Sequence, residues 1–168
     1  MKNAALLFIL VLFGWACTPS SEQQAMDLLD KSIAAHGGGE GWENLKGIIF
    51  RKWTRMLDSV GNIESELDQW HEFRFVPRFE GKISWTEDSI VHWMSWDGVA
   101  FRYQMGENEV LNPDFLAAKK KDFDAAFYTA AQPWKLLDKG GKLIYEGKKN
   151  LENGAEVASI RVDYGPDA

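Results

Sequence analysis

The sequence is poor in the residues that build disulfides and metal centres. Cys17 is the only cysteine among 168 residues, so neither an intramolecular disulfide nor a thiolate-rich metal centre can form. The three histidines, His36, His71 and His92, show no metal-ligand spacing, and the sequence contains no G-x-S-x-G nucleophile elbow. We therefore expect no metal site, no cofactor and no catalytic residue, and a protein that is not an enzyme.

Clustered positive charge is also missing. The formal net charge is −6, the sequence pI is about 5.1, and the lysines and arginines form no basic stripe. Proteins that bind nucleic acid use clustered Lys and Arg side chains to displace the counterions of the phosphates. The charge distribution therefore argues against nucleic acid as a partner.

No apolar run is long enough for an ordinary transmembrane helix, which takes about 20 residues. The run at 4–13 follows the positive Lys2 and is typical of a secretory signal peptide. Small residues, Gly14 and Ala16, precede Cys17, so the segment resembles the lipobox of bacterial lipoproteins. The resemblance implies cleavage before Cys17 and lipidation of its thiol. The alternative is an ordinary signal peptide followed by an incidental cysteine.

The chain divides into three predicted parts. Residues 1–16 form the signal peptide with its lipobox, 17–24 the lipidated cysteine and a polar tether, and 25–168 one domain. Each buried methylene of an acyl chain contributes about 0.8 kcal/mol, so two or three chains hold a protein on a membrane. We expect a lipoprotein of the bacterial cell envelope, anchored in the outer membrane and facing the periplasm.

The domain begins with a helix and continues with strands. Ser21 and Gln24 form a capping box, and Gly37 is expected to end the helix in the left-handed conformation. A cap at Asn112 and the proline after it predict a second, mid-chain helix. Period-two patterns predict strands at 48–57, 64–76, 79–85, 90–105 (a hairpin), 142–149 and 156–164. The order predicts an α+β fold built on an antiparallel meander.

Tryptophan is abundant, with eight residues, and aromatic rings concentrate in the hairpin. Asp97-Gly98 is typical of a two-residue turn, which would pair Trp96 with Val99 and Met94 with Phe101. One face of the hairpin would then be apolar, comprising His92, Met94, Trp96, Val99, Phe101 and Tyr103. On the opposite face, Trp93 would lie opposite Arg102 as a cation–π pair.

Two interpretations of this ring-rich face stay open. A curved sheet covered by only two helices could leave a cavity lined by Met94, Trp96, Val99, Phe101, Tyr103 and Trp134. Alternatively, the rings could fill an ordinary core between sheet and helix.

The order of elements resembles the outer-membrane lipoprotein-sorting superfamily of periplasmic carriers and lipid-anchored receptors. The similar segments are MDLLDKSIAAHGG (26–38), FRFVPRFEGKISW (73–85), MSWDGVAFRYQ (94–104) and QPWKLLDKGGKLIYEG (132–147). The resemblance implies an open, strongly bent antiparallel half-barrel whose N-terminal and mid-chain helices form a lid over an apolar cavity. Because 156–164 reads as a central strand, we expect the half-barrel to be incomplete at the C-terminus.

These observations predict a non-enzymatic protein that binds a hydrophobic ligand, such as an acyl chain or the lipid moiety of a lipoprotein. Its expected partners are this small molecule or lipid and the membrane at its anchor, whereas the sequence does not identify a protein partner. The alternative is a glycan-binding module, in which Trp53, Trp70, Trp85 and Trp93 would form an exposed platform.

Overall fold

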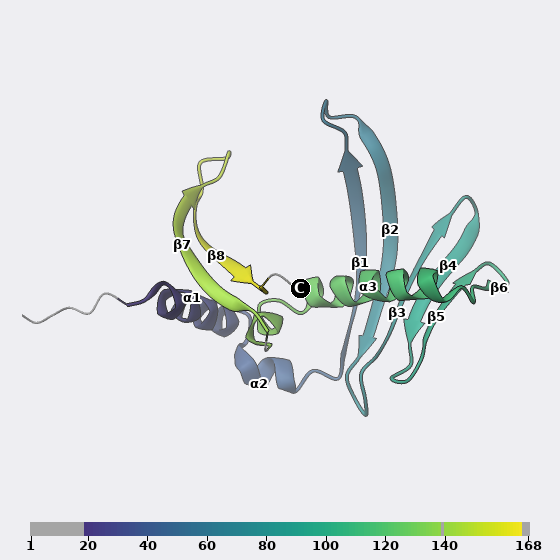
Figure 1. Cartoon of the computed structure of the whole chain (residues 1–168), viewed down its shortest axis with the longest axis horizontal. Helices are drawn as coiled ribbons and strands as arrows, with labels where there is room; N and C mark the ends of the chain where they lie inside the picture. The colour runs from purple at the N-terminus through teal and green to yellow at the C-terminus, as the bar shows by residue number, and fades with distance from the viewer. Residues whose placement is uncertain (1–18, 139, 166–168) are drawn as a thin grey trace, which may run out of the picture. The chain divides into compact units, whose positions relative to one another are not determined.

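The described residues form an α+β protein with two antiparallel sheets (Figure 1). The computed structural model describes residues 19–138 and 140–165, so the predicted signal peptide, Cys17 and the first residues of the tether lie outside the described part. Contacts divide the chain into two compact units, Leu29–Lys139 and the remainder on either side. Each unit is described by itself.

The larger unit contains a six-stranded meander in which each strand pairs with the next along the chain. Its strands are β1 (Gly47–Leu57), β2 (Ile63–Arg74), β3 (Glu80–Glu87), β4 (Ile90–Trp96), β5 (Phe101–Met105) and β6 (Asn108–Glu109). The helical elements are α1 (Ser21–Ala35), which spans the boundary between the units, α2 (Gly38–Glu43), α3 (Pro113–Ala130) and the 3-10 helix η1 (Trp134–Leu137). The sheet is open, which agrees with the predicted half-barrel fold.

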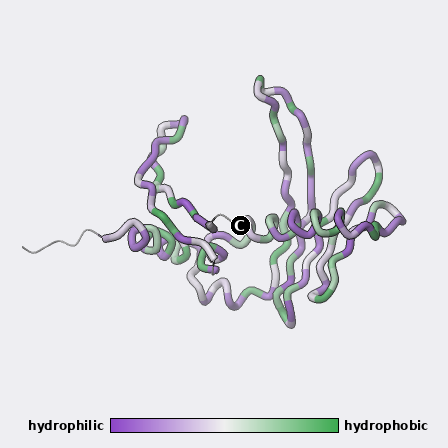
Figure 2. Tube along the Cα trace, viewed as in Figure 1, coloured by the Kyte–Doolittle hydropathy of each residue, from purple (hydrophilic) through white to green (hydrophobic). Residues whose placement is uncertain are grey.

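Helix α3 lies across one face of the sheet, which we call the inner face (Figure 1). As predicted, Asn112 caps this helix, because its Oδ1 accepts a hydrogen bond of 3.0 Å from the Phe115 N–H. The core between helix and sheet contains Phe73, Ile83, Met94, Tyr103 and Phe123. Figure 2 shows hydrophobic and hydrophilic residues interspersed along these strands, as expected where side chains alternate between two faces.

Gly81 of β3 allows α3 to approach the sheet closely. A Cβ atom at this position would lie 2.6 Å from Phe73 Cδ1 and 2.7 Å from Phe123 Cζ. Real Cβ atoms do not come this close to other atoms. The missing side chain therefore makes room for the Phe123 ring over the centre of the sheet.

The hairpin turn is longer than predicted. Trp96 pairs with Phe101, and Met94 pairs with Tyr103, so the loop has four residues, Asp97–Ala100. The loop is stabilised by Asp97 Oδ1, which accepts hydrogen bonds from the N–H groups of Val99 (2.9 Å) and Ala100 (2.8 Å). The pairing shifts by two positions, so the remaining residues keep their predicted face, but Val99 moves into the loop and is 74% exposed.

The same shift changes the predicted cation–π pair. Trp93 lies opposite Gln104, whereas Arg102 lies opposite Ser95. The cation over the Trp93 ring is instead Lys82 of β3, whose Nζ lies 5.6 Å from the ring centroid.

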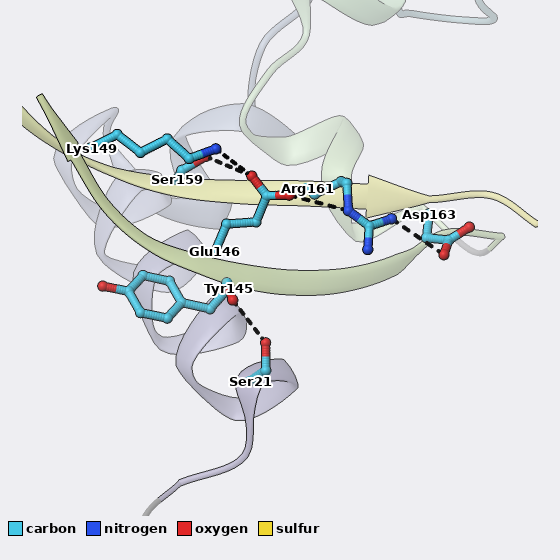
Figure 3. A network of polar contacts seen from close by, with 7 residues as sticks. All are labelled: Ser21, Tyr145, Glu146, Lys149, Ser159, Arg161 and Asp163. Atoms are coloured by element: carbon cyan, nitrogen blue, oxygen red, sulfur yellow. Dashed lines mark hydrogen bonds and ion pairs between the residues drawn. The ribbon is translucent and has the colours of Figure 1, made fainter. Parts of the chain in front are cut away.

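The predicted capping box of the first helix is also displaced. Ser20 caps the helix, because its Oγ accepts a hydrogen bond of 3.1 Å from the Gln23 N–H. Ser21 instead donates its hydroxyl proton to the Tyr145 carbonyl oxygen at 3.0 Å (Figure 3). The end of the helix agrees with the prediction, since Gly37 adopts a left-handed conformation with φ of 101°.

In the smaller unit, β7 (Lys142–Asn150) and β8 (Glu156–Asp163) form a two-stranded sheet at the predicted positions. Glu146 of β7 connects the strands through an ion pair with Arg161 and a hydrogen bond from Ser159, and it also pairs with Lys149 of its own strand (Figure 3). The hydrogen bond from Lys149 is the main reason that the pKa of the Glu146 carboxyl is lowered. Such exposed pairs contribute little stability, so we interpret this network as an ordinary polar feature of the protein surface.

Candidate functional site

A groove of about 560 Å³ lies between α3 and the inner face of the sheet. Its apolar wall comprises Leu67, Ile83, Trp85, Met94, Tyr103 and Ala126. The rest of the lining is Ala125 and the polar side chains Lys52, Ser65, Glu66, Gln69, Glu87, Lys119, Asp122 and Thr129. A lining of this mixed kind suits a molecule with one apolar part and one polar part.

Aromatic rings hold the floor of the groove in place. Tyr103 is 4% exposed, and its hydroxyl lies 3.0 Å from Nδ1 of His92. The His92 ring is stacked on Trp85 at 5.3 Å, and the Phe115 ring of α3 meets Tyr103 edge-on at 4.9 Å. Burial raises the pKa of the Tyr103 hydroxyl, so it stays protonated at neutral pH. These contacts give the floor a fixed shape.

His71 lies on the same face of β2 as Gln69, two positions along the strand. Its side chain is buried, and neither ring nitrogen has a hydrogen-bond partner in the described part of the chain. Burial, and to a smaller extent the positive charge of Lys52, lower the pKa of the His71 imidazole to about 4. The ring is therefore neutral at pH 7, and it keeps one unused donor and one unused acceptor within the core, although it does not itself line the groove.

Lys52 lies directly opposite Gln69 on the neighbouring strand β1. Among the described residues, no carboxylate pairs with Lys52 and no group hydrogen-bonds to the side chain of Gln69. Both side chains are thus available to a polar group bound in the groove. Lys119, on the α3 side, is already paired with Asp122 at 2.9 Å.

Only two of the six residues predicted to line a cavity, Met94 and Tyr103, line this groove. Trp96 and Phe101 share their face but pack against α3: the Phe101 and Phe123 ring centroids lie 5.9 Å apart, and Lys120 Nζ lies 4.9 Å from the Trp96 ring. Val99 is exposed in the hairpin loop.

The sixth predicted residue, Trp134, lies in a different hollow. Its ring stacks on Trp42 with 4.7 Å between the centroids, and its Nε1–H donates a 3.0 Å hydrogen bond to the Gly38 carbonyl oxygen. This hollow of about 280 Å³ is also lined by Phe75 and Phe127. Trp134 therefore holds α2 against η1 and has no part in the groove.

The sequence-based prediction missed Lys52, Gln69 and His71. Each stands two residues from an apolar residue of the inner face, namely Phe50, Leu67 or Phe73, and this period-two spacing places them on the helix-facing side. What the sequence does not contain is the position of α3, which covers the Phe73 end of this side and leaves the Gln69 end open to the groove.

The described residues contain no group of three or more His, Cys, Asp or Glu side chains that could hold a metal ion. Within the same residues, no helix is long and apolar enough to cross a membrane. Compared with known proteins, the chain matches no protein-family model, and neither curated proteins nor solved structures give a match.

Proposed function

We propose that this protein is a lipid-anchored bacterial envelope protein that binds an amphiphile with an acyl chain in the groove beneath α3. The groove itself is the observation that carries the proposal, because its volume of about 560 Å³ lies in the range of small-molecule sites, roughly 300–1,000 Å³. The helix and the sheet do not fill this space with their own side chains.

The lining accounts for both ends of such a ligand. An acyl chain in contact with Leu67, Ile83 and Trp85 would leave water, and each buried methylene would contribute about 0.8 kcal/mol. Lys52 carries a positive charge that no carboxylate among the described residues neutralises. A carboxylate or phosphate head group beside Lys52 and Gln69 would therefore gain a charge-assisted hydrogen bond.

The proposed anchor rests on the N-terminal sequence. The apolar run at 4–13 and the small residues before Cys17 favour export and lipidation. The similarity to lipoprotein-sorting proteins supports a role in handling lipid or lipoprotein acyl chains in the envelope, and the open antiparallel sheet agrees with it.

Lipid extraction and native mass spectrometry of the purified full-length protein test the proposal, together with titration by a dansyl-labelled fatty acid. We expect co-purifying lipid or saturable uptake of the probe. Ala126→Trp would fill the groove from α3 and abolish uptake, whereas Ala118→Trp, at an exposed position of the same helix, would not. A ligand-free protein that takes up no fatty acid would contradict the proposal.

A further inference from the structure

We infer that the outer face of the sheet, opposite α3, carries a second binding site that takes an uncharged saccharide. The inference is independent of the acyl-chain groove, because side chains alternate between the two faces of each strand. A hollow of about 290 Å³ lies on this outer face. Its walls are formed by Asp68, Trp70, Ser84, Thr86 and Val91, with a contribution from Trp85.

The register of the strands explains the hollow. Ser84 on β3 pairs with Trp70 on β2 and with Trp93 on β4, so a small residue separates two indoles. Neighbouring strands lie about 4.8 Å apart, which places the backbones of the two tryptophans about 10 Å apart. The short Ser84 side chain therefore leaves a depression beside the Trp70 indole, and both residues line the hollow.

The indoles on this face are accessible. Trp70 is 52% exposed, and Trp53, on the neighbouring strand β1, is 57% exposed. Solvent-facing strand positions are usually polar, and an exposed cluster of large apolar side chains is typical of a binding surface. A flat indole can stack against the C–H face of a sugar ring, because the π face is negative and the C–H groups are weakly positive.

The polar groups in the hollow suit the hydroxyls of a sugar. The hydroxyls of Ser84 and Thr86 form no hydrogen bond with other described residues, so both can donate and accept. Asp68 is held by Arg51, whose Nε donates a 2.7 Å hydrogen bond to Oδ1. The hydrogen bonds from Arg51 lower the pKa of the Asp68 carboxyl, which is therefore an ionised acceptor at neutral pH.

The charge pattern favours an uncharged ligand. Arg51 pairs with Asp68, and Arg55 pairs with Glu66 at 2.6 Å while its guanidinium carbon lies 4.5 Å from the Trp53 ring. The two arginines nearest the hollow thus each have an anion beside them. An anionic membrane surface or nucleic acid would meet no excess positive charge.

Of the four tryptophans expected in a glycan platform, three share the outer face, namely Trp53, Trp70 and Trp93. Trp85 belongs to the inner face, where its ring stacks on His92 and lines the groove. The saccharide site therefore centres on Trp70 and Ser84.

Titration of the intact protein with cellohexaose and chitohexaose, followed by tryptophan fluorescence and calorimetry, tests the site. We expect saturable binding of at least one oligosaccharide. Trp70→Ala would weaken it at least tenfold, and Ser84→Trp would abolish it by filling the hollow. Ile49→Ala, which alters a more exposed apolar residue of the outer face outside the hollow, would leave it unchanged.

The two sites are distinguishable in the same variants. Trp70→Ala should keep fatty-acid uptake, and Ala126→Trp should keep oligosaccharide binding. Oligosaccharide binding that survives Trp70→Ala, or its absence in the unaltered protein at millimolar ligand, would overturn the inference. So would binding to phosphatidylethanolamine–phosphatidylglycerol vesicles that depends on Trp70 when no oligosaccharide binds.

Discussion

His71 is stacked face to face on Phe50 of the neighbouring strand, with 4.7 Å between the ring centroids and 17° between the ring planes. The pair lies on the inner face of the sheet, where the imidazole is buried and has no hydrogen-bond partner among the described residues. A polar ring in this position costs free energy of desolvation, which the stacking contact only partly offsets. A buried, unpaired polar group of this kind is unusual enough in a folded protein to suggest a functional reason.

The first prediction concerns the pH dependence of stability. The pKa of His71 is about 4 in the folded protein, whereas its ordinary value, which applies to the unfolded chain, is 6.5. Between these two pH values the unfolded chain therefore binds more protons than the folded protein. The contribution of the neutral His71 ring to the free energy of unfolding is therefore fully present above pH 6.5. It is lost as the pH drops toward 4, by up to roughly 3 kcal/mol. His71→Leu should remove this dependence and match or exceed the unaltered protein at pH 7.

Urea unfolding at pH 4.5, 5.5 and 7.5 measures this effect. His36→Gln is the matched control, because His36 is exposed and its replacement should leave the pH dependence in place. Equal pH dependence in the His71→Leu variant and the unaltered protein would disprove the assignment.

The second prediction concerns the docking of α3. Gly81→Val would place side-chain atoms where the Phe73 and Phe123 rings lie, so the helix or the strand must move. We expect a loss of about 1–3 kcal/mol in the free energy of unfolding, the usual cost of overpacking a core. Gly41→Ala, where an added Cβ meets no atom within 4 Å, should not destabilise the protein. Unchanged stability of Gly81→Val in thermal and urea unfolding would contradict the close packing.

The third prediction concerns the head group of the proposed ligand. Lys52→Gln should weaken binding of a fatty acid about three- to tenfold, because it removes the unpaired charge in the groove. Binding of the methyl ester of the same acid should change little, since the ester has no charge. Lys82→Gln, on the outer face beside Trp93, is the control and should affect neither ligand. An equal loss for acid and ester would indicate that Lys52 acts only through packing.

The fourth prediction concerns the hairpin loop. The backbone hydrogen bonds from Ala100 and Val99 lower the pKa of Asp97, so its contribution to stability is present at neutral pH and is lost as the pH falls through the lowered pKa. Asp97→Ala should lower the melting temperature by a few degrees at pH 7 and by less at pH 3. Glu107→Ala, in the next turn, should have no comparable effect. A melting temperature that is unchanged at pH 7 would exclude a stabilising role for the Asp97 carboxylate.

Local sequence patterns were sufficient to predict the order of the elements. Period-two alternation places strands in the described meander, and Asn112 with Pro113 starts α3 at the observed residue. The faces of the hairpin were also predictable, because a pairing shift of two positions preserves alternation. The length of the hairpin loop was not predictable, because Asp97-Gly98 is locally compatible with a two-residue turn. In the structure, the Asp97 side chain instead accepts hydrogen bonds from Val99 and Ala100 and so stabilises a longer loop.

The location of the groove depends on tertiary packing. The sequence alone determined which residues face the same side of the sheet, since this follows from the backbone geometry of a strand. Only the fold decided which of them α3 would cover, because that depends on the space at Gly81 into which Phe123 fits. Trp96 and Phe101 therefore became core contacts of the helix, while Trp85, Gln69 and Lys52 were left to line the open groove.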